Sequence, residues 1–404
     1  MAPRRQPAVL LVDDDQFMLG MQSRMLRSMG YTMIGNASSA DAALMLLGEG
    51  RAAVDVVICD LNMPGVDGLE FLRLLSQSAF RGNVILLSGE GPRILHAAQK
   101  LLAGRPLMIL GALEKPAGHL ALRMLLDRWR PTVPLEAAAP QPIYTAADLL
   151  AAQRDKQWVL HYQPKVDLRT GALIGTEALV RWNYPEHGLI YPDRFIGVAE
   201  ECGAIGPLTD WALRAALDQL ALWHQDGLHI QMAVNVSMEN LLTPGFARMV
   251  TALVRDAGLS PQDLTLELTE SRIMAMSPVP LETLVRLRMQ RFDLAIDDFG
   301  TGHSSLAQLR DVPFTELKID RGFVQDARHN PLIRPILEGS VGIAQRLGLR
   351  SVAEGVETAD DWMLLREIGC DTAQGYFIGR PMPGDRLGVW LAEWLSERPR
   401  LAAL

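Results

Sequence analysis

Short apolar segments alternate with helical patterns after residue 144, and this alternation constrains the fold more than any other feature of the sequence. Amphipathic stretches such as 211–225 and 332–348 lie between most of the apolar segments. Strand–helix alternation predicts a parallel sheet covered by helices, and eight such units in about 260 residues fit a (βα)8 barrel of the TIM type. The connection at 168–172 is of hairpin length, so we expect the barrel to begin with an antiparallel strand. The expected strands are 158–165, 173–180, 230–236, 264–270, 292–298, 315–320, 349–355 and 370–375.

A segment rich in proline and alanine separates this region from the N-terminal part of the chain. It reads RPTVPLEAAAPQP over residues 130–142, and its prolines remove backbone donors and disfavour regular structure. We therefore expect one domain at 7–128, a linker at 129–143 and the barrel at 144–396.

In the N-terminal part, apolar runs separated by helical patterns predict a doubly wound, flavodoxin-like α/β domain. Four runs end at Asp13, Asp60, Ser88 and Lys115, and Asp14 follows Asp13. Ends of parallel strands converge on one crevice, where three carboxylates repel each other unless a cation such as Mg²⁺ is present. In that crevice Asp60 would accept a phosphoryl group, Lys115 and the ion would offset the developing charge, and Ser88 would bond a phosphoryl oxygen.

Polar residues also lie at or near the carboxyl ends of the expected barrel strands. They are Glu177, Asn235, Glu267, Asp297, Asp298, Lys318, Glu354 and Gln374. These strand ends meet over one face of a barrel, so the residues are expected to form a single site. The set contains oxygen donors without His or Cys, which suits Mg²⁺ or Mn²⁺.

Two such ions would suit phosphodiester hydrolysis. Asp297 is placed to bridge the ions, with Asp298 on the second. Lys318 could orient the attacking water, and Glu354 is the candidate general base or a further metal ligand.

Four motifs of the N-terminal part resemble the receiver domain of two-component response regulators: LVDDD (11–15), CDLNMPGVDG (59–68), LLSG (86–89) and EKP (114–116). The resemblance implies that Asp60 is the phosphoacceptor and that Asp14, Asp60 and the carbonyl of Asn62 bind one Mg²⁺. Asp13 and Ser88 would complete the pocket, with a cis-proline turn at Lys115-Pro116. The implied partner is a sensor histidine kinase or a phosphotransfer protein. Ala112 stands where the family often has an aromatic switch residue, so the signal must take another route.

The C-terminal part resembles the EAL-domain phosphodiesterases, which hydrolyse cyclic di-GMP, and the order of the two parts resembles response regulators of the RocR type. The signature is EALVR at 177–181. Further matching motifs are YQPK (162–165), NVS (235–237), ELTES (267–271), DDFGTGHSSL (297–306), LKID (317–320), AEGVE (353–357) and QGYFIGRPM (374–382).

This resemblance implies a role for each matching residue and the opening of cyclic di-GMP to linear pGpG. One metal would be held by Glu177, Asn235, Glu267 and Asp297, and the second by Asp297 and Asp298, with Glu354 as support or base. Lys318 would contact the catalytic water. The dinucleotide would contact Gln163, Arg181 and Gln374. Glu270 would hold the loop that begins at Asp297.

The leading interpretation is a cyclic di-GMP phosphodiesterase controlled by phosphorylation of Asp60, and the alternative is a non-catalytic cyclic di-GMP receptor that signals through protein contacts. A net charge of −8 argues against DNA as a partner. The absence of a long apolar run argues against membrane insertion, and three unpaired cysteines suit the cytoplasm. Receiver and EAL domains both tend to self-associate, so we expect a homodimer or a higher homo-oligomer. The cognate kinase, the sign of control, the choice between Mg²⁺ and Mn²⁺, and the downstream process stay open.

Overall fold

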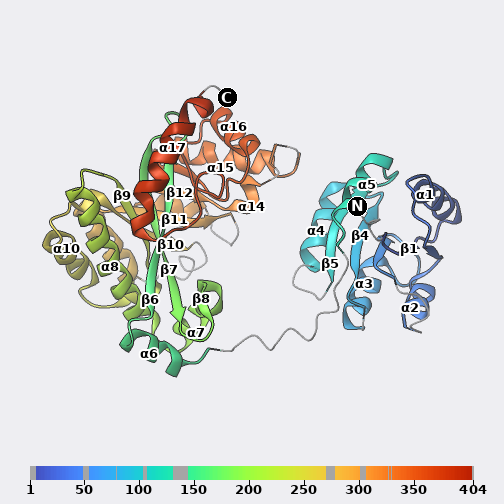
Figure 1. The fold of residues 1–404 in the computed structure, drawn as a ribbon, viewed down its shortest axis with the longest axis horizontal. Helices are drawn as coiled ribbons and strands as arrows, with labels where there is room; N and C mark the ends of the chain where they lie inside the picture. The colour runs from blue at the N-terminus through green and yellow to red at the C-terminus, as the bar shows by residue number, and fades with distance from the viewer. Residues whose placement is uncertain are drawn as a thin grey trace. The chain divides into compact units, whose positions relative to one another are not determined.

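The computed structural model describes residues 6–48, 54–78, 80–102, 107–130, 144–269, 278–300, 306–325, 327–328 and 330–402. The chain divides into two compact units, Met1–Gln141 and Pro142–Leu404 (Figure 1). Of the expected linker at 129–143, only the first two residues lie within the described part. In that part, no helix combines the length and the apolar character needed to cross a lipid bilayer.

The N-terminal unit is a five-stranded parallel sheet in the order β2-β1-β3-β4-β5. The strands are β1 (Val9–Val12), β2 (Ile34–Ala37), β3 (Val56–Asp60), β4 (Asn83–Ser88) and β5 (Met108–Glu114). The helices are α1 (Gln16–Ser28), α2 (Ala40–Gly48), α3 (Gly68–Gln77), α4 (Pro92–Leu102) and α5 (His119–Asp127). This is the predicted doubly wound architecture.

Both faces of this sheet are covered, which explains why its central strands β1, β3 and β4 are apolar at every position between their ends. Leu10 of β1 belongs to the hydrophobic cluster formed with α2, α3 and α4. The next residue, Leu11, belongs to the cluster formed with α1 and α5. Successive side chains of a strand point to opposite faces, so a fully buried strand shows no polar alternation.

The sequence pattern missed strand β2. Its residues read IGNA, and Gly35 and Asn36 are exposed at the edge of the sheet. Ile34 packs against one hydrophobic cluster of the unit and Ala37 belongs to the other, while the two residues between them are exposed, so the segment lacks the continuous apolar run that marked the other four strands.

The C-terminal unit is a closed eight-stranded barrel. Its strands are β6 (Trp158–Asp167), β7 (Leu173–Tyr184), β9 (Gln231–Asn235), β10 (Leu264–Thr269), β11 (Asp293–Phe299), β12 (Glu316–Ile319), β13 (Arg350–Ala353) and β14 (Thr372–Ala373). Strand β6 pairs antiparallel with both β7 and β14, and the other pairings around the barrel are parallel. The predicted antiparallel first strand is therefore confirmed. A short strand, β8 (Gly188–Ile190), extends β7 as a hairpin.

Helices surround the barrel and supply its hydrophobic core. They are α6 (Ala146–Arg154), α7 (Ile196–Glu201), α8 (Ile205–Gln225), α9 (Met238–Leu242), α10 (Phe246–Asp256), α12 (Pro278–Met289), α13 (Leu306–Asp311), α14 (Arg321–Val324), α15 (Arg334–Leu347), α16 (Ala359–Glu367) and α17 (Leu387–Ala402). The described part of this unit also contains three short 3-10 helices: Pro192–Arg194, Pro261–Asp263 and Gly384–Arg386.

Alternate residues of each barrel strand face this core, and the residues between them face the barrel interior. In β10, Leu264, Leu266 and Leu268 lie in the core cluster, which leaves Thr265 and Glu267 for the interior. The same alternation in the other strands makes the barrel interior largely polar.

Candidate functional site

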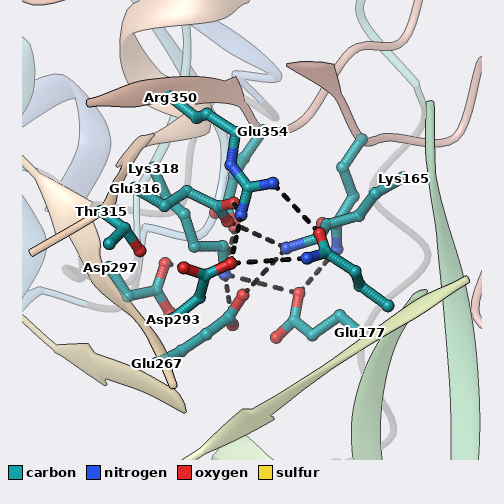
Figure 2. Close-up of polar contacts among 12 residues, drawn as sticks. Lys165, Glu177, Glu267, Asp293, Asp297, Thr315, Glu316, Lys318, Arg350 and Glu354 are labelled. Atoms are coloured by element: carbon teal, nitrogen blue, oxygen red, sulfur yellow. Dashed lines mark hydrogen bonds and ion pairs between the residues drawn. The ribbon is translucent and has the colours of Figure 1, made fainter. Parts of the chain in front are cut away.

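The parallel barrel strands run in the same direction, which brings polar side chains from distant parts of the chain to one end of the barrel. Figure 2 shows Glu177 from β7, Glu267 from β10, Asp297 from β11 and Lys318 from β12 converging there with Glu354, which follows β13. All of them were predicted to share a site from their positions at strand ends.

Lys318 lies at the centre of this group. Its side chain is fully buried, and its Nζ atom contacts four carboxylates: Glu267 at 2.7 Å, Glu354 at 2.7 Å, Asp297 at 3.0 Å and Glu177 at 3.5 Å. Burial by itself would lower the pKa of Lys318, but attraction to these carboxylates raises the pKa well above its usual value. The ammonium group therefore supplies positive charge at the point where the carboxylates converge.

Side-chain amides hold Glu177 in one orientation. Nδ2 of Asn235 donates to Oε1 of Glu177 at 2.9 Å, and Nε2 of Gln374 donates to Oε2 at 2.6 Å. Gln374 also donates to Oε1 of Gln163 at 3.1 Å, and Gln163 donates to the carbonyl of Gly379 at 3.1 Å. Both oxygens of Glu177 are thus constrained before any ligand binds.

A β-bulge makes the Asp297–Asp298 pair possible. Consecutive residues of a regular strand point to opposite faces, so two adjacent aspartates would not reach the same site. The register between β11 and β12 shifts between Ile296 and Phe299, where one extra residue is accommodated in β11. Asp298 has a φ of 57°, in the left-handed region. Carboxylate oxygens of Asp297, Asp298 and Glu354 consequently lie within 4.8 Å of one another.

The donor set fits hard divalent cations. It consists of carboxylate and amide oxygens, the ligands that Mg²⁺ and Mn²⁺ prefer. Burial raises the pKa of Glu354 well above its usual value, and burial together with Asp297 raises the pKa of Asp298 to about 6. These shifts show that negative charge is costly here, and a cation would remove that cost. Lys318 offsets part of this negative charge through its contacts with Asp297 and Glu354.

A cavity of about 250 Å³ opens onto these groups. Its lining includes Glu177, Asp297 and Glu354 together with Gln163, Gln374 and Tyr376. A polar cavity of this composition suits a phosphate-containing ligand bound next to cations.

The N-terminal unit has its own acidic site at the carboxyl ends of β1 and β3. Nζ of Lys115 lies 2.6 Å from Oδ2 of Asp13 and 2.8 Å from Oδ2 of Asp60. Oxygens of Asp13, Asp14 and Asp60 lie within 4.8 Å of one another, which fits one Mg²⁺ ion. Among the described residues, the buried Oδ1 of Asp60 has no hydrogen-bond partner. Burial raises the pKa of Asp60 despite the nearby Lys115.

The other predicted residues of this unit surround the acidic site. Ser88 is buried at the end of β4, and its Oγ accepts a hydrogen bond from the backbone N–H of Glu90 at 3.0 Å. Asn62 is exposed and donates to a carboxylate oxygen of Glu90 at 3.3 Å. The Lys115-Pro116 peptide bond is cis. Ala112 is a half-buried residue of β5.

Residues 146–381 match the family model of the EAL domain. The chain belongs to the EAL-domain family. Residues 9–122 match the response regulator receiver domain, so a receiver domain precedes the EAL domain. The predicted combination of the two families is therefore confirmed.

Relatives of this receiver–EAL chain include cyclic di-GMP phosphodiesterases. The chain is 35% identical to the cyclic di-GMP phosphodiesterase RocR of Pseudomonas aeruginosa over 378 residues, which is 93% of this chain and 96% of RocR. It is 40% identical over 255 residues to the bifunctional diguanylate cyclase/cyclic di-GMP phosphodiesterase MucR of the same organism, which is 63% of this chain and 37% of MucR. A solved c-di-GMP complex of the PaMucR phosphodiesterase has a TM-score of 0.57 at 42% identity and covers 60% of this chain and 98% of that chain.

Arg181, which was predicted to bind the dinucleotide, makes its contacts outside the carboxylate cluster. Arg181 is buried in β7, donates to the carbonyl of Val180 at 2.8 Å and lies over the ring of Tyr191, 5.0 Å from its centroid. Its buried Nε has no hydrogen-bond partner within the described parts of the chain. Glu270 lies outside the described residues, as do residues 301–305 of the loop that it was predicted to hold.

The sequence did not predict a role for three charged residues inside the EAL barrel: Lys165, Glu316 and Arg350. Lys165 belongs to the YQPK motif, and it lies two residues after Gln163, so strand periodicity directs both side chains inward. That spacing was the signal that could have placed Lys165 inside the barrel.

Proposed function

We propose that this EAL domain hydrolyses cyclic di-GMP to linear pGpG by two-metal phosphodiester hydrolysis and that phosphorylation of Asp60 in the receiver controls the reaction. The observation that carries the proposal is the convergence of Glu177, Glu267, Asp297 and Glu354 on Lys318 beside a polar cavity. The names of the relatives RocR and MucR support the choice of substrate.

Two cations, Mg²⁺ or Mn²⁺, would supply Lewis-acid activation of water and offset the charge that develops on the phosphate. Glu177, Asn235, Glu267 and Asp297 would hold one ion, and Asp297 and Asp298 would hold the other. The bulge that directs both aspartates to one face supports this division.

Glu354 would act as the general base. Its raised pKa makes its carboxylate a better proton acceptor than an exposed glutamate. Lys318, 2.7 Å from Glu354, would orient the water and stabilise negative charge on the phosphate. The water oxygen would form a bond to phosphorus while the P–O bond to one sugar oxygen breaks. Glu354 would take the proton of the water, and the leaving sugar oxygen would take up a proton from solvent to become the hydroxyl of the linear product.

Gln163, Gln374 and Arg181 would bind the dinucleotide. Gln163 and Gln374 line the cavity, and Oε1 of Gln374 is buried without a hydrogen-bond partner among the described residues. Arg181 brings a guanidinium group that can pair with a phosphate.

In the receiver, Asp60 would accept the phosphoryl group from a sensor histidine kinase or a phosphotransfer protein. The unpartnered Oδ1 of Asp60 is available for this chemistry, and Lys115 and one Mg²⁺ at Asp13 and Asp14 would offset the charge. A separate expectation concerns assembly. We expect the chain to form a homo-oligomer, and light scattering would measure its mass in solution.

Product analysis tests the catalytic proposal. Purified protein is incubated with cyclic di-GMP and Mg²⁺ or Mn²⁺, beside Glu177→Ala and Glu354→Gln variants and an EDTA control. We expect pGpG from the wild type alone. If the wild type binds cyclic di-GMP and leaves it intact, with and without a small phosphodonor, the receptor alternative replaces the hydrolase.

A further inference from the structure

A row of alternating charges continues from the catalytic end of the barrel into its interior (Figure 2). Below the carboxylates around Lys318 lies a second lysine, Lys165, which is 4% exposed. Its Nζ lies 3.3 Å from Oε1 of Glu267 and 3.0 Å from Oε1 of Glu316. Lys165 therefore links a predicted metal ligand to a residue at the start of β12, at the opposite end of the barrel.

Arg350 contacts Glu316 from the end of the barrel opposite the carboxylate cluster. Nη2 of Arg350 lies 3.4 Å from Oε2 of Glu316 and 3.0 Å from Oδ2 of Asp293. The other terminal nitrogen of Arg350 donates to Oε1 of Gln231 at 3.1 Å. Each member of the row thus has partners on both sides, which fixes the position of Lys165.

The strands leave room for Lys165 between these two ends. Ala233 and Ala295 are fully buried. Each lies two residues before a predicted metal ligand, Asn235 or Asp297, and faces the barrel interior like that ligand. Small side chains at this level allow a long side chain from β6 to reach across the interior.

The two oxygens of Glu267 are divided between two lysines. Oε1 accepts from Lys165, and Oε2 accepts from Lys318 at 2.7 Å. A cation in the cluster would compete with Lys318 for Oε2, whereas Lys165 approaches from the interior and keeps Oε1. The carboxylate is therefore oriented with one oxygen toward the cluster.

We propose that Lys165 is a positioning residue that orients Glu267 as a metal ligand and that Glu316 and Arg350 hold Lys165 in place. The inference rests on the proposed function, because it takes Glu267 to bind a cation. Outer partners that orient a ligand typically change metal affinity by about 10–100-fold when they are removed.

Direct electrostatic repulsion between Lys165 and the metal predicts the opposite change in metal affinity. An ammonium group near a metal site repels a divalent cation, so its removal would tighten metal binding if repulsion were its main effect. Orientation of Glu267 predicts weaker binding. The direction of the change therefore separates the two effects.

The test is Mn²⁺ binding to the full chain without substrate, measured by electron paramagnetic resonance of free Mn²⁺. Lys165→Met keeps the length of the side chain and removes the ammonium. We expect the Kd for Mn²⁺ at the EAL site to rise by at least about tenfold, with partial recovery in Lys165→Arg. The Asp60→Asn change is kept in every protein so that binding at the receiver stays constant.

Two further variants separate positioning from a structural role. Lys165→Met/Glu316→Gln removes both charges and leaves no unpaired charge in the interior, so it should recover the thermal unfolding temperature without recovering Mn²⁺ affinity. Arg288→Met removes a cation at the far end of the row, where it contacts Asp293 at 3.6 Å, and should leave Mn²⁺ affinity unchanged.

Unchanged or tighter Mn²⁺ binding in Lys165→Met overturns the inference and leaves the proposed function standing. Recovery of affinity in the double variant also overturns it, because the role of Lys165 would then be structural. If the wild type binds no Mn²⁺ at the EAL site, both the inference and the proposed two-metal function fail.

Discussion

The receiver and the EAL barrel each place a lysine among carboxylates, but they do so at different depths. In the receiver, Lys115 is 17% exposed and bridges Asp13 and Asp60. In the barrel, Lys318 is fully buried and contacts four carboxylates. Lys115 leaves Oδ1 of Asp60 without a hydrogen-bond partner among the described residues, whereas Lys318 must balance a larger number of carboxylates.

The two sheets explain this difference in depth. The receiver sheet is covered on both faces by helices, so its interior is apolar and polar groups are confined to the strand ends. The barrel sheet has one face on the helices and one face on its own interior, which can hold polar side chains along its whole length. Further charged side chains can therefore lie inside the barrel next to its site, whereas the apolar interior of the receiver cannot hold them next to the receiver site.

The largest expected effect is on catalysis in the barrel. Glu354→Gln keeps the shape of the side chain and removes its basic oxygen, so kcat should fall about 10²–10⁴-fold, the contribution typical of a positioned base. Steady-state hydrolysis of cyclic di-GMP measures the change, with equilibrium binding as the control. A variant that retains more than a tenth of the wild-type kcat would assign the base to another residue.

Removal of the two lysines tests the difference in depth. In metal-free protein, Lys318→Met leaves several buried carboxylates without a counter-charge and should destabilise the barrel by about 3–5 kcal/mol. Lys115→Met should cost less, about 1.5–3 kcal/mol, because it removes hydrogen bonds to charged groups at a more open site. Chemical unfolding of the full chain, localised by hydrogen exchange, measures both.

Added Mn²⁺ sharpens this comparison. It should restore more stability to Lys318→Met than it adds to the wild type, because the cation replaces the missing ammonium. Equal stabilisation of the two proteins would show that the lysine and the metal do not share the same carboxylates.

A third, smaller effect is expected on the stability of each domain, where a glycine near the site lies close to the backbone of another segment. A Cβ atom on Gly375 would lie 2.2 Å from backbone atoms of Val356, and one on Gly68 would lie 2.2 Å from the carbonyl oxygen of Asp60. Gly375→Ala and Gly68→Ala should each destabilise their own domain by about 1–3 kcal/mol, the usual range for overpacking. Hydrogen exchange localises the loss, and Gly48→Ala, which has no neighbour within 4 Å, is the control.

Communication between the domains has the smallest expected effect. A small phosphodonor should change cyclic di-GMP turnover of the wild type by about fivefold, the lower end of typical allosteric coupling. Asp60→Asn should keep the basal rate and lose this response. Equal rates for both proteins, with and without the phosphodonor, would remove phosphorylation control and leave the catalytic proposal intact.

Much of the architecture was predictable because it depends on local patterns. All eight barrel strands were expected from apolar segments, and the antiparallel pairing of β6 and β7 followed from a connection too short for a crossover. The edge strand β2 was missed because Gly35 and Asn36 break the apolar run. Motif spacing also placed Glu177, Glu267, Asp297, Lys318 and Glu354 at strand ends, where the structure brings them together.

The sequence by itself determined the eight barrel strands and four of the five receiver strands, the families to which the motifs belong and the polar residues at the ends of strands, because these properties follow from residue type and short-range spacing. Only the tertiary structure decided that a bulge turns both Asp297 and Asp298 toward the site. It also decided that Lys165 lies between Glu267 and Glu316, residues 102 and 151 positions away in the chain. Such contacts depend on strand register and on closure of the barrel, and no local pattern specifies either of these.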